Sequence, residues 1–498
     1  MRTDPADARL APERQDADEL DALTDASAGA RAIRGSALRT GSFAGQLALA
    51  LVAVPLMVRH LGPADYGRYV TVSAIVFIVG GITEGGLMWL GVRHYVSMRG
   101  DERERYQRNL SGLRLVLTTA GVLAGIAFTW ATHADGQVVA GTAIVGFGTI
   151  LLLAQTTYSV PLQAELRFGA LSAVDLLRQA ALTAVIVVLV ATGAGLVPFF
   201  WASVASGVTV LVATLLLVRG EIDSLRPSFD LRAWRAMAHE VLPYGLAAAV
   251  GVIYFRFAVV IMSYIATPVE TGIYATAFRI VETIAGIPWV AVATGFPILA
   301  HAAGNDKDRM RYALQRMFEA AALAGAGIAL AIALGAQFAI DVVAGPKFQA
   351  SVPVLQLQGL AMITVFLMAT WSFGLLSLKR YRALLVANAL AAGVAAAATF
   401  ALVPPLGAKG AAIATVLAEA VLVVAYVVAL SRADRRLLPR VDFLWKIALA
   451  AGVGALAAVL PIGSLASALI GVAAYVAAAF ALRAVPMELV HALRRRPA

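Results

Sequence analysis

Two arginines lie inside long apolar segments of this chain, where an uncompensated charge is unfavourable. Arg256 and Arg279 fall in two consecutive apolar segments, and Glu282 follows Arg279 at i,i+3. A charge at mid-membrane costs roughly 2.5–3.5 kcal/mol, so such residues face a partner or a polar cavity. Because guanidinium groups bind phosphate oxygens in a bidentate geometry, we expect Arg256, Arg279 and Glu282 to form part of a cationic cavity. The alternative is a structural Arg279–Glu282 bridge on one helix face.

Two acidic residues in the first half of the chain are candidates for carrying a coupling proton or ion. Glu84 is surrounded by Gly80, Gly81, Gly85 and Gly86, which permit a kink or close helix packing. The alternative role for Glu84 is a counter-ion for Arg93 or Arg178. Asp175 is the second candidate, and a structural i,i+3 bridge to Arg178 is its alternative.

Further polar residues occur within apolar segments. Glu419 has no partner on its own segment, so it is expected either to pair with Arg256 or to line the cavity. Other positions suit either sugar contacts or hydrogen bonds between helices: Gln46, Gln155, Thr156, Thr157 and Trp371.

Residue types required by common enzymes and metal sites are scarce. The chain has no cysteine, and its six histidines lack metal-ligand spacing, so we expect neither a metal nor a cofactor. Asp16 with Asp18 and Asp306 with Asp308 fit an Asp-x-Asp pattern, but one pair lies in a polar tail and the other in a short basic loop. The sequence therefore favours a protein that is not an enzyme.

The composition indicates a membrane protein. Of 498 residues, 60% are hydrophobic and only 14% are charged, whereas a soluble protein carries about a quarter charged residues. Apolar runs of about 20 residues span a bilayer as helices. The chain contains fourteen such runs, numbered here as spans 1–14: Gly41–Val58, Tyr69–Leu90, Leu113–Trp130, Val138–Tyr158, Leu171–Ala191, Leu196–Val218, Val241–Ile265, Thr271–Leu299, Glu319–Val343, Val352–Leu378, Ala383–Val403, Ala411–Leu430, Leu444–Leu460 and Leu465–Leu482.

The distribution of Lys and Arg predicts the orientation in the cytoplasmic membrane. Basic residues cluster after spans 2, 6, 8, 10 and 12 and at the C-terminus, whereas the alternate loops are nearly free of them. Because short cytoplasmic loops carry the excess of positive charge, both termini are expected in the cytoplasm. The net charge of +10 is therefore a topology signal, and nucleic acid is not an expected partner.

An internal repeat organises the spans. The segment Val54–Tyr69 is echoed 205 residues later at Val259–Tyr274, with Pro63 matching Pro268 and Gly67 matching Gly272. Six spans separate the two copies, so both have the same orientation, as in parallel transporter repeats. We expect an all-α polytopic membrane protein with two six-helix lobes. The predicted parts are a disordered cytoplasmic tail (1–35), an N-lobe (36–235), a C-lobe (236–440), and two extra helices with a basic C-terminus (441–498).

Four motifs, spread over residues 40–420, resemble those of Wzx-type polysaccharide flippases of the MOP (MATE-like) superfamily. They are the segments Pro55–Gly67 (PLMVRHLGPADYG), Thr83–Gly86 (TEGG), Thr271–Arg279 (TGIYATAFR) and Gly407–Thr415 (GAKGAAIAT). The resemblance implies movement of undecaprenyl-diphosphate-linked oligosaccharide across the cytoplasmic membrane. It also implies membrane lipids and a glycan polymerase or glycosyltransferases as partners.

Each copy of the repeat contains a polar turn, here called an elbow: Leu61–Gly67 in the first copy and Ala266–Gly272 in the second. The elbows have a structural interpretation. Gly62, Pro63 and Gly67 suit a turn, and Tyr66 and Tyr69 suit the interfacial aromatic belt. Arg59 is expected at the outer surface, against an emerging diphosphate or a lipid phosphate.

Alternative functions remain open from the sequence. A MATE-like exporter of small organic cations is expected to have a cavity dominated by acids, whereas arginines here are at least as numerous. A membrane glycosyltransferase or polymerase is disfavoured because the external loops are short. A scaffold for glycan assembly that transports nothing is the remaining alternative.

Overall fold

The computed structural model of the chain describes residues 26–220, 226–305 and 307–485, and these form helices without any strand. Each of the fourteen predicted spans falls on helical structure in the predicted order. The first half of the chain contains α2 (Ala26–Glu84), α3 (Leu87–Ser97), α4 (Gly100–Ala131), α5 (Gly136–Tyr158), α6 (Val160–Ala164), α7 (Phe168–Ala191) and α8 (Leu196–Leu217).

The second half contains α9 (Leu231–Ile265), α10 (Pro268–Asn305), α11 (Lys307–Val343), η2 (Pro346–Phe348), α12 (Ser351–Ser377), α13 (Tyr381–Ala433), η3 (Arg435–Leu437), α14 (Leu444–Ala455), η4 (Leu456–Val459) and α15 (Ser464–Ala481). Within the described residues, nine helices are long and apolar enough to cross a membrane by length and composition. Two of them, α2 and α13, each contain two predicted spans joined at a bend.

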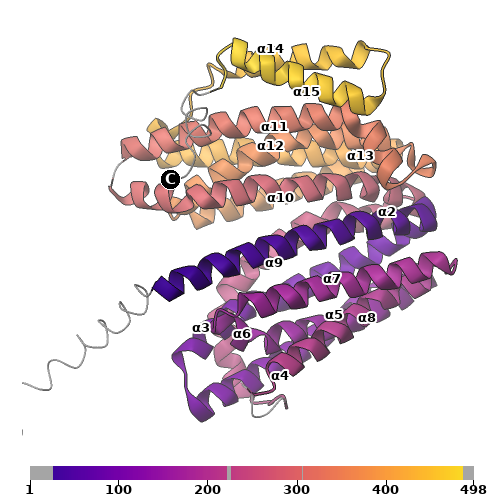
Figure 1. Cartoon of the computed structure of the whole chain (residues 1–498), viewed down its shortest axis with the longest axis vertical. Coiled ribbons are helices and arrows are strands. Elements are labelled where there is room, and N and C mark those ends of the chain that lie inside the picture. Colours follow the sequence, from indigo (N-terminus) through magenta and orange to yellow (C-terminus); the bar gives the residue numbers. More distant parts are fainter. Residues whose placement is uncertain (1–25, 221–225, 306, 486–498) are drawn as a thin grey trace, which may run out of the picture.

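The helices form two bundles that lie side by side (Figure 1). One bundle contains α2 to α8 and the other contains α10 to α13, while α14 and α15 lie at the edge of the second bundle against α11. These are the two predicted lobes and the two extra helices. Their residue boundaries stay a prediction.

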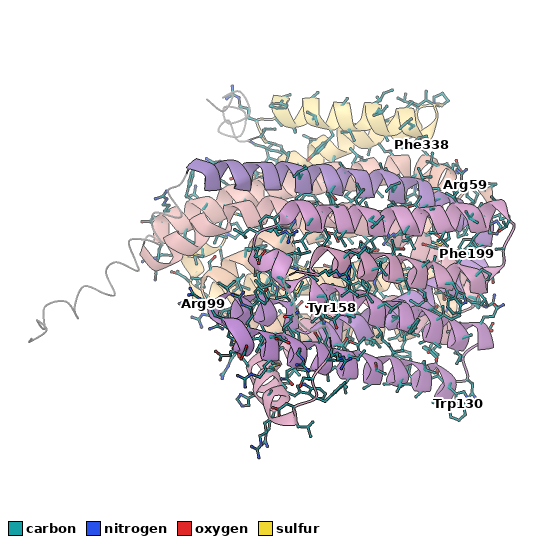
Figure 2. The ribbon with its side chains drawn as sticks, turned by 60° about the horizontal axis from the view of Figure 1, so that its bottom comes forward. Arg59, Arg99, Trp130, Tyr158, Phe199 and Phe338 are labelled. Carbon is teal, nitrogen blue, oxygen red and sulfur yellow. The ribbon has the colours of Figure 1, made fainter. Side chains whose placement is uncertain are left out.

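The two ends of the molecule are packed differently. We call the end carrying Arg59, Phe199 and Trp130 the outer end and the opposite end, which carries Arg99, the inner end, after the predicted orientation (Figure 2). Near the outer end one hydrophobic core includes Met57 of the N-lobe and Met262 of the C-lobe. Another core cluster, around Phe318, lies within the second bundle. The lobes are thus joined through a shared core toward the outer end.

The repeated elbows contact each other reciprocally. A Cβ on Gly67 would overlap the backbone carbonyl of Pro268, and a Cβ on Gly272 would overlap the backbone carbonyl of Pro63. Pro63 and Pro268 are matched positions of the repeat, as are Gly67 and Gly272. The contact is therefore symmetric, and glycine at both positions allows the backbones to approach closely.

The elbows differ in detail from the predicted turns. The first departs from helical geometry at Gly62 alone (φ 70°), and Gly67 is helical, so close packing rather than turn geometry explains it. Tyr66 is only 3% exposed and belongs to the shared core, so its assignment to an interfacial belt is wrong. Tyr69 stacks on Tyr66 and on Phe200.

Arg59 connects the two lobes at the outer end. Its guanidinium donates hydrogen bonds to the backbone carbonyls of Asp341 and Val342, at 2.7 and 2.6 Å. These carbonyls belong to the last turn of α11, where a cation is favourable because the helix dipole and unpaired carbonyls are negative. Arg59 is thus a helix cap in this structure.

Helix α9 passes from one lobe to the other. At its inner end Met237 packs in a cluster with Leu87 and Leu110, and the Trp234 indole donates to the Asn109 carbonyl at 3.0 Å. Near the middle of α9, Tyr254 contacts the second bundle. The predicted C-lobe therefore begins with a helix whose inner half packs on the N-lobe.

Two predicted boundaries differ from the structure. Span 2 is interrupted because Gly85 and Gly86 have positive φ (42° and 92°), which separates α2 from α3. Helix α2 begins at Ala26, so residues 26–35 of the predicted disordered tail are helical. The rest of that tail lies outside the described residues.

Candidate functional site

Arg256, Arg279 and Glu282 meet between α9 and α10. Glu282 accepts from Arg256 Nη2 at 2.7 Å through one oxygen and from Arg279 Nη1 at 3.1 Å through the other. Arg279 and Glu282 form the expected i,i+3 pair, and Arg256 joins them from the neighbouring helix. Two guanidinium groups share one carboxylate, so the cluster keeps one excess positive charge.

Aromatic rings surround the Arg256 guanidinium. Its centre lies 4.6 Å from the Phe77 ring, 5.0 Å from Phe255 and 5.8 Å from Phe278. The ring faces stabilise the cation, more strongly where water is excluded. Since Phe77 belongs to α2, Arg256 lies at the contact between the lobes. Its Nε is buried without a hydrogen-bond partner in the described structure, so the guanidinium retains donor capacity.

Arg279 also faces the first lobe. It is close enough to Tyr66 and Tyr69 of α2 to interact electrostatically with both. Its side chain is 48% exposed, whereas that of Arg256 is 13% exposed. Both arginines are thus held by the C-lobe and directed toward α2, with Arg279 the more accessible.

A small cavity of about 90 Å³ lies inside the second bundle, next to this cluster. Among the described residues its wall includes Glu282 and Glu419 but neither arginine. A cavity lined by both arginines stays a prediction. Glu419 accepts a hydrogen bond from the Tyr254 hydroxyl at 3.2 Å, and its other oxygen is buried without a described partner. Of its two expected roles, Glu419 lines a cavity and does not pair with Arg256.

Glu84 is held in a network at the inner half of the N-lobe. It forms an ion pair with Arg114 of α4, rather than with Arg93 or Arg178, and accepts the backbone N–H of Met88 at 3.2 Å. The Arg114 side chain is 1% exposed and also donates to the Thr157 hydroxyl at 3.1 Å. Glu84 thereby links the end of α2, the first turn of α3, and α4.

Arg114 was not among the sequence candidates, and the structure places its side chain in the core. Its position one residue inside span 3 was the available signal. Because Glu84 pairs with the buried Arg114, a structural role accounts for its position. A role of Glu84 in ion coupling stays a prediction.

The remaining sequence candidates are spread through the fold. Asp175 is exposed, and the described part of the chain contains no ion pair within 4 Å between it and Arg178. Gln46 donates to Ser42 on its own helix at 3.3 Å, and Gln155 donates to Thr214 of α8 at 3.0 Å. Trp371 is buried and stacks on Phe318.

Thr156 and Thr157 belong to the same class of candidate. The Thr156 hydroxyl donates to the carbonyl of Leu153 at 2.9 Å, and Thr157 accepts from Arg114. Gln155, Thr157 and Trp371 thus serve packing between helices, and they do not meet the arginine cluster. Within the described residues no group of three or more His, Asp or Glu is placed to hold a metal ion.

Comparison with solved structures shows which fold this is. The lipid II flippase MurJ, in an inward closed conformation, superposes with a TM-score of 0.73 at 13% identity, covering 91% of this chain and 99% of that chain. An inward-facing multidrug resistance MATE family transporter of the MOP superfamily gives 0.60 at 15% identity, covering 78% and 95%.

A MOP superfamily transporter from Pyrococcus furiosus, described by the reverse polarity of its binding pocket, gives a TM-score of 0.52 at 16% identity, with coverage of 82% and 96%. No curated protein sequence matches the chain significantly. The structural likeness confirms the predicted MOP-type fold of two lobes and two extra helices.

A family model described as "Polysaccharide biosynthesis protein" matches residues 56–353, well over half of the chain. The match includes both elbows, the arginine cluster and the Glu84–Arg114 pair. Together with the fold, it confirms the resemblance seen in the sequence motifs. This chain is a multi-pass membrane protein of the polysaccharide biosynthesis protein family, with the fold of the MOP superfamily.

Proposed function

We propose that the protein flips undecaprenyl-diphosphate-linked oligosaccharide from the inner to the outer leaflet of the cytoplasmic membrane by alternating access. The observation that carries the proposal is the cluster in which two arginines share one carboxylate at the lobe contact. Its excess positive charge suits a diphosphate, which guanidinium groups bind bidentately. Family membership and the likeness to a lipid II flippase support the same class of substrate. Both termini are cytoplasmic in this proposal.

The cluster suggests how the substrate is taken up. Without substrate, Glu282 compensates the arginines and keeps them directed toward α2. An entering diphosphate displaces Glu282 from Arg279, the more exposed arginine, and the unpaired Nε of Arg256 provides a further donor. Such a site between lobes that rock against each other is typical of secondary transporters.

Removal of each cluster charge tests the proposal. A deletion strain is expected to retain lipid-linked glycan at the cytoplasmic face of the membrane, and the wild-type chain is expected to restore export. Arg256→Gln and Arg279→Gln should each reduce the flipping rate about tenfold, since a hydrogen bond to a charged group contributes roughly 1.5–3 kcal/mol. The amounts of protein in the membrane should be unchanged.

Arg316→Gln is the matched control. Arg316 forms an i,i+3 pair with Glu319 at 2.8 Å and lies over the Tyr312 ring, but these residues are on α11, away from the lobe contact. This variant should flip normally. If both cluster variants transport like wild type, the site assignment is wrong. If the deletion strain exports glycan normally, the flippase function is wrong.

A MATE-like exporter of small molecules, coupled to a cation, is the second candidate. Glu419 favours it, because a buried acid that lines a small cavity and has one oxygen without a described partner is the type of group that binds a proton or cation. Unchanged glycan export together with altered drug sensitivity in the deletion strain would support this function. A glycosyltransferase or polymerase activity is not part of the proposal, and a polymerase or glycosyltransferase as a partner stays a prediction.

A further inference from the structure

A large apolar groove runs between the two halves of α13. It has a volume of about 1000 Å³, and all described residues that line it belong to α13 or to the turn before it. Its walls carry exposed apolar side chains, including Val386 (66% exposed), Leu390, Val424 (61% exposed) and Val428. Because one bent helix supplies every described wall, the groove is open on the side away from α13.

The bend in α13 brings its two halves side by side, with the groove between them. Gly407 has a φ of 56° and turns the chain at the outer end, where a Cβ on Gly410 would overlap the backbone of Leu402. The two halves are therefore in close contact at the bend. Toward the inner end, a hydrogen bond of 2.9 Å from Asn388 to the Tyr426 hydroxyl connects them along one side. The groove lies between these two halves, on the inner side of the bend.

The inner mouth of the groove is basic. Four exposed basic residues line it, Lys379, Arg380, Arg382 and Arg432. In the part of the chain that the structure describes, none of the four takes part in an ion pair within 4 Å. The neighbouring acid, Asp434, is instead paired with Lys307 at 3.6 Å. Among the described residues, no acid thus neutralises the charge at the mouth.

We propose that this groove binds an anionic glycerophospholipid of the inner leaflet, with an acyl chain against the apolar walls and the phosphate at the basic mouth. Basic pockets between membrane helices on the cytoplasmic side bind anionic lipid headgroups, and basic residues near the surface attract such lipids. Topology alone explains basic residues in a loop, but it does not require a deep apolar groove beneath them. The proposal is independent of the flipped substrate and of the arginine cluster.

Fluorescence quenching by brominated lipids tests this site. Since the chain has no cysteine, Val386→Cys provides a single attachment point for a bimane probe in the groove. In nanodiscs of phosphatidylcholine, acyl-brominated phosphatidylglycerol should quench this probe at about tenfold lower mole fraction than brominated phosphatidylcholine. A probe at Leu123→Cys, on the exposed surface of α4, should show no preference between the two lipids.

Two kinds of variant separate headgroup and chain binding. Replacing all four mouth residues with Gln should abolish the preference, whereas replacing four other basic residues of the inner end with Gln (Arg93, Arg99, Arg105 and Arg232) should retain it. Val424→Phe, which fills the groove and keeps the charges, should also abolish the preference. Val424→Phe provides a test that does not depend on folding of the fourfold charge variant.

Several results would overturn the proposal. Equal quenching by the two lipids at Val386→Cys would show that the groove does not select anionic headgroups. Loss of the preference in the control charge variant would show a general effect of surface charge. Absence of quenching by either lipid would show that a protein segment fills the groove.

Discussion

Replacing Glu84 with Gln distinguishes a structural role of this residue from a role in ion coupling. The change keeps the shape of the side chain and removes the charge that faces Arg114. Because the Arg114 side chain is only 1% exposed, its guanidinium would stay buried with the Thr157 hydroxyl as its remaining described partner. Breaking a fully buried ion pair costs about 3–5 kcal/mol. Glu84 is 32% exposed, so water partly compensates, and we expect a loss of about 2–3 kcal/mol.

The free energy of unfolding in detergent, measured by denaturant titration with circular dichroism, checks this value. Adding Arg114→Met to Glu84→Gln should recover about 1 kcal/mol or more, because the uncompensated charge is removed together with its partner. Glu104→Gln is the matched control. Glu104 is exposed to a similar extent (29%), but its partner Arg108 is 36% exposed, so the loss should be at most about 0.5 kcal/mol. A Glu84→Gln protein that is as stable as wild type but does not transport would refute the structural role and support coupling.

Two further predictions concern the lobe contact and the N-lobe core. Gly67→Ala should separate the elbows, since the added Cβ overlaps the Pro268 carbonyl. A single Met57→Cys reporter, buried in the shared core, should then react with maleimide severalfold faster. Gly136→Ala is the control, because a Cβ there has no neighbour within 4 Å. Equal reactivity in both would mean that the elbows do not close the outer end. Gln155→Leu should lower the free energy of unfolding by about 0.6–1.7 kcal/mol through loss of the bond to Thr214, with flipping unchanged. Lost flipping at unchanged stability would instead indicate a sugar contact.

The spans and their order could be predicted because hydropathy depends on local composition, and lipid requires every backbone group to be paired within a helix. The helix break at Gly85 and Gly86 was harder, since glycine inside an apolar segment is compatible with packing, a kink or an interruption. The repeat predicted two equivalent lobes. It did not predict that the elbows touch, because sequence symmetry does not specify which faces meet.

In the candidate site, contacts within one helix could be predicted from the sequence, whereas contacts between helices could not. The Arg279–Glu282 pair follows from spacing on one helix, whereas the Arg256–Glu282 pair depends on how α9 and α10 are rotated relative to each other. Arg59 was expected to meet a phosphate, but its partners are carbonyls 282 and 283 positions away. Tyr66 was assigned to the membrane interface from its residue type alone, and the shared core that buries it forms only when both lobes are in place.

The reciprocal contact of Gly67 with Pro268 and Gly272 with Pro63 has the symmetry of an isologous interface. Such an interface uses the same patch on both partners, as in homodimers. Asp65 and Glu270 also occupy matched positions of the repeat, but Asp65 pairs with Arg68 whereas Glu270 accepts the backbone N–H of Ala408. The two halves thus meet at the glycines as the subunits of a homodimer do, whereas the residues beside the glycines have different partners in each half.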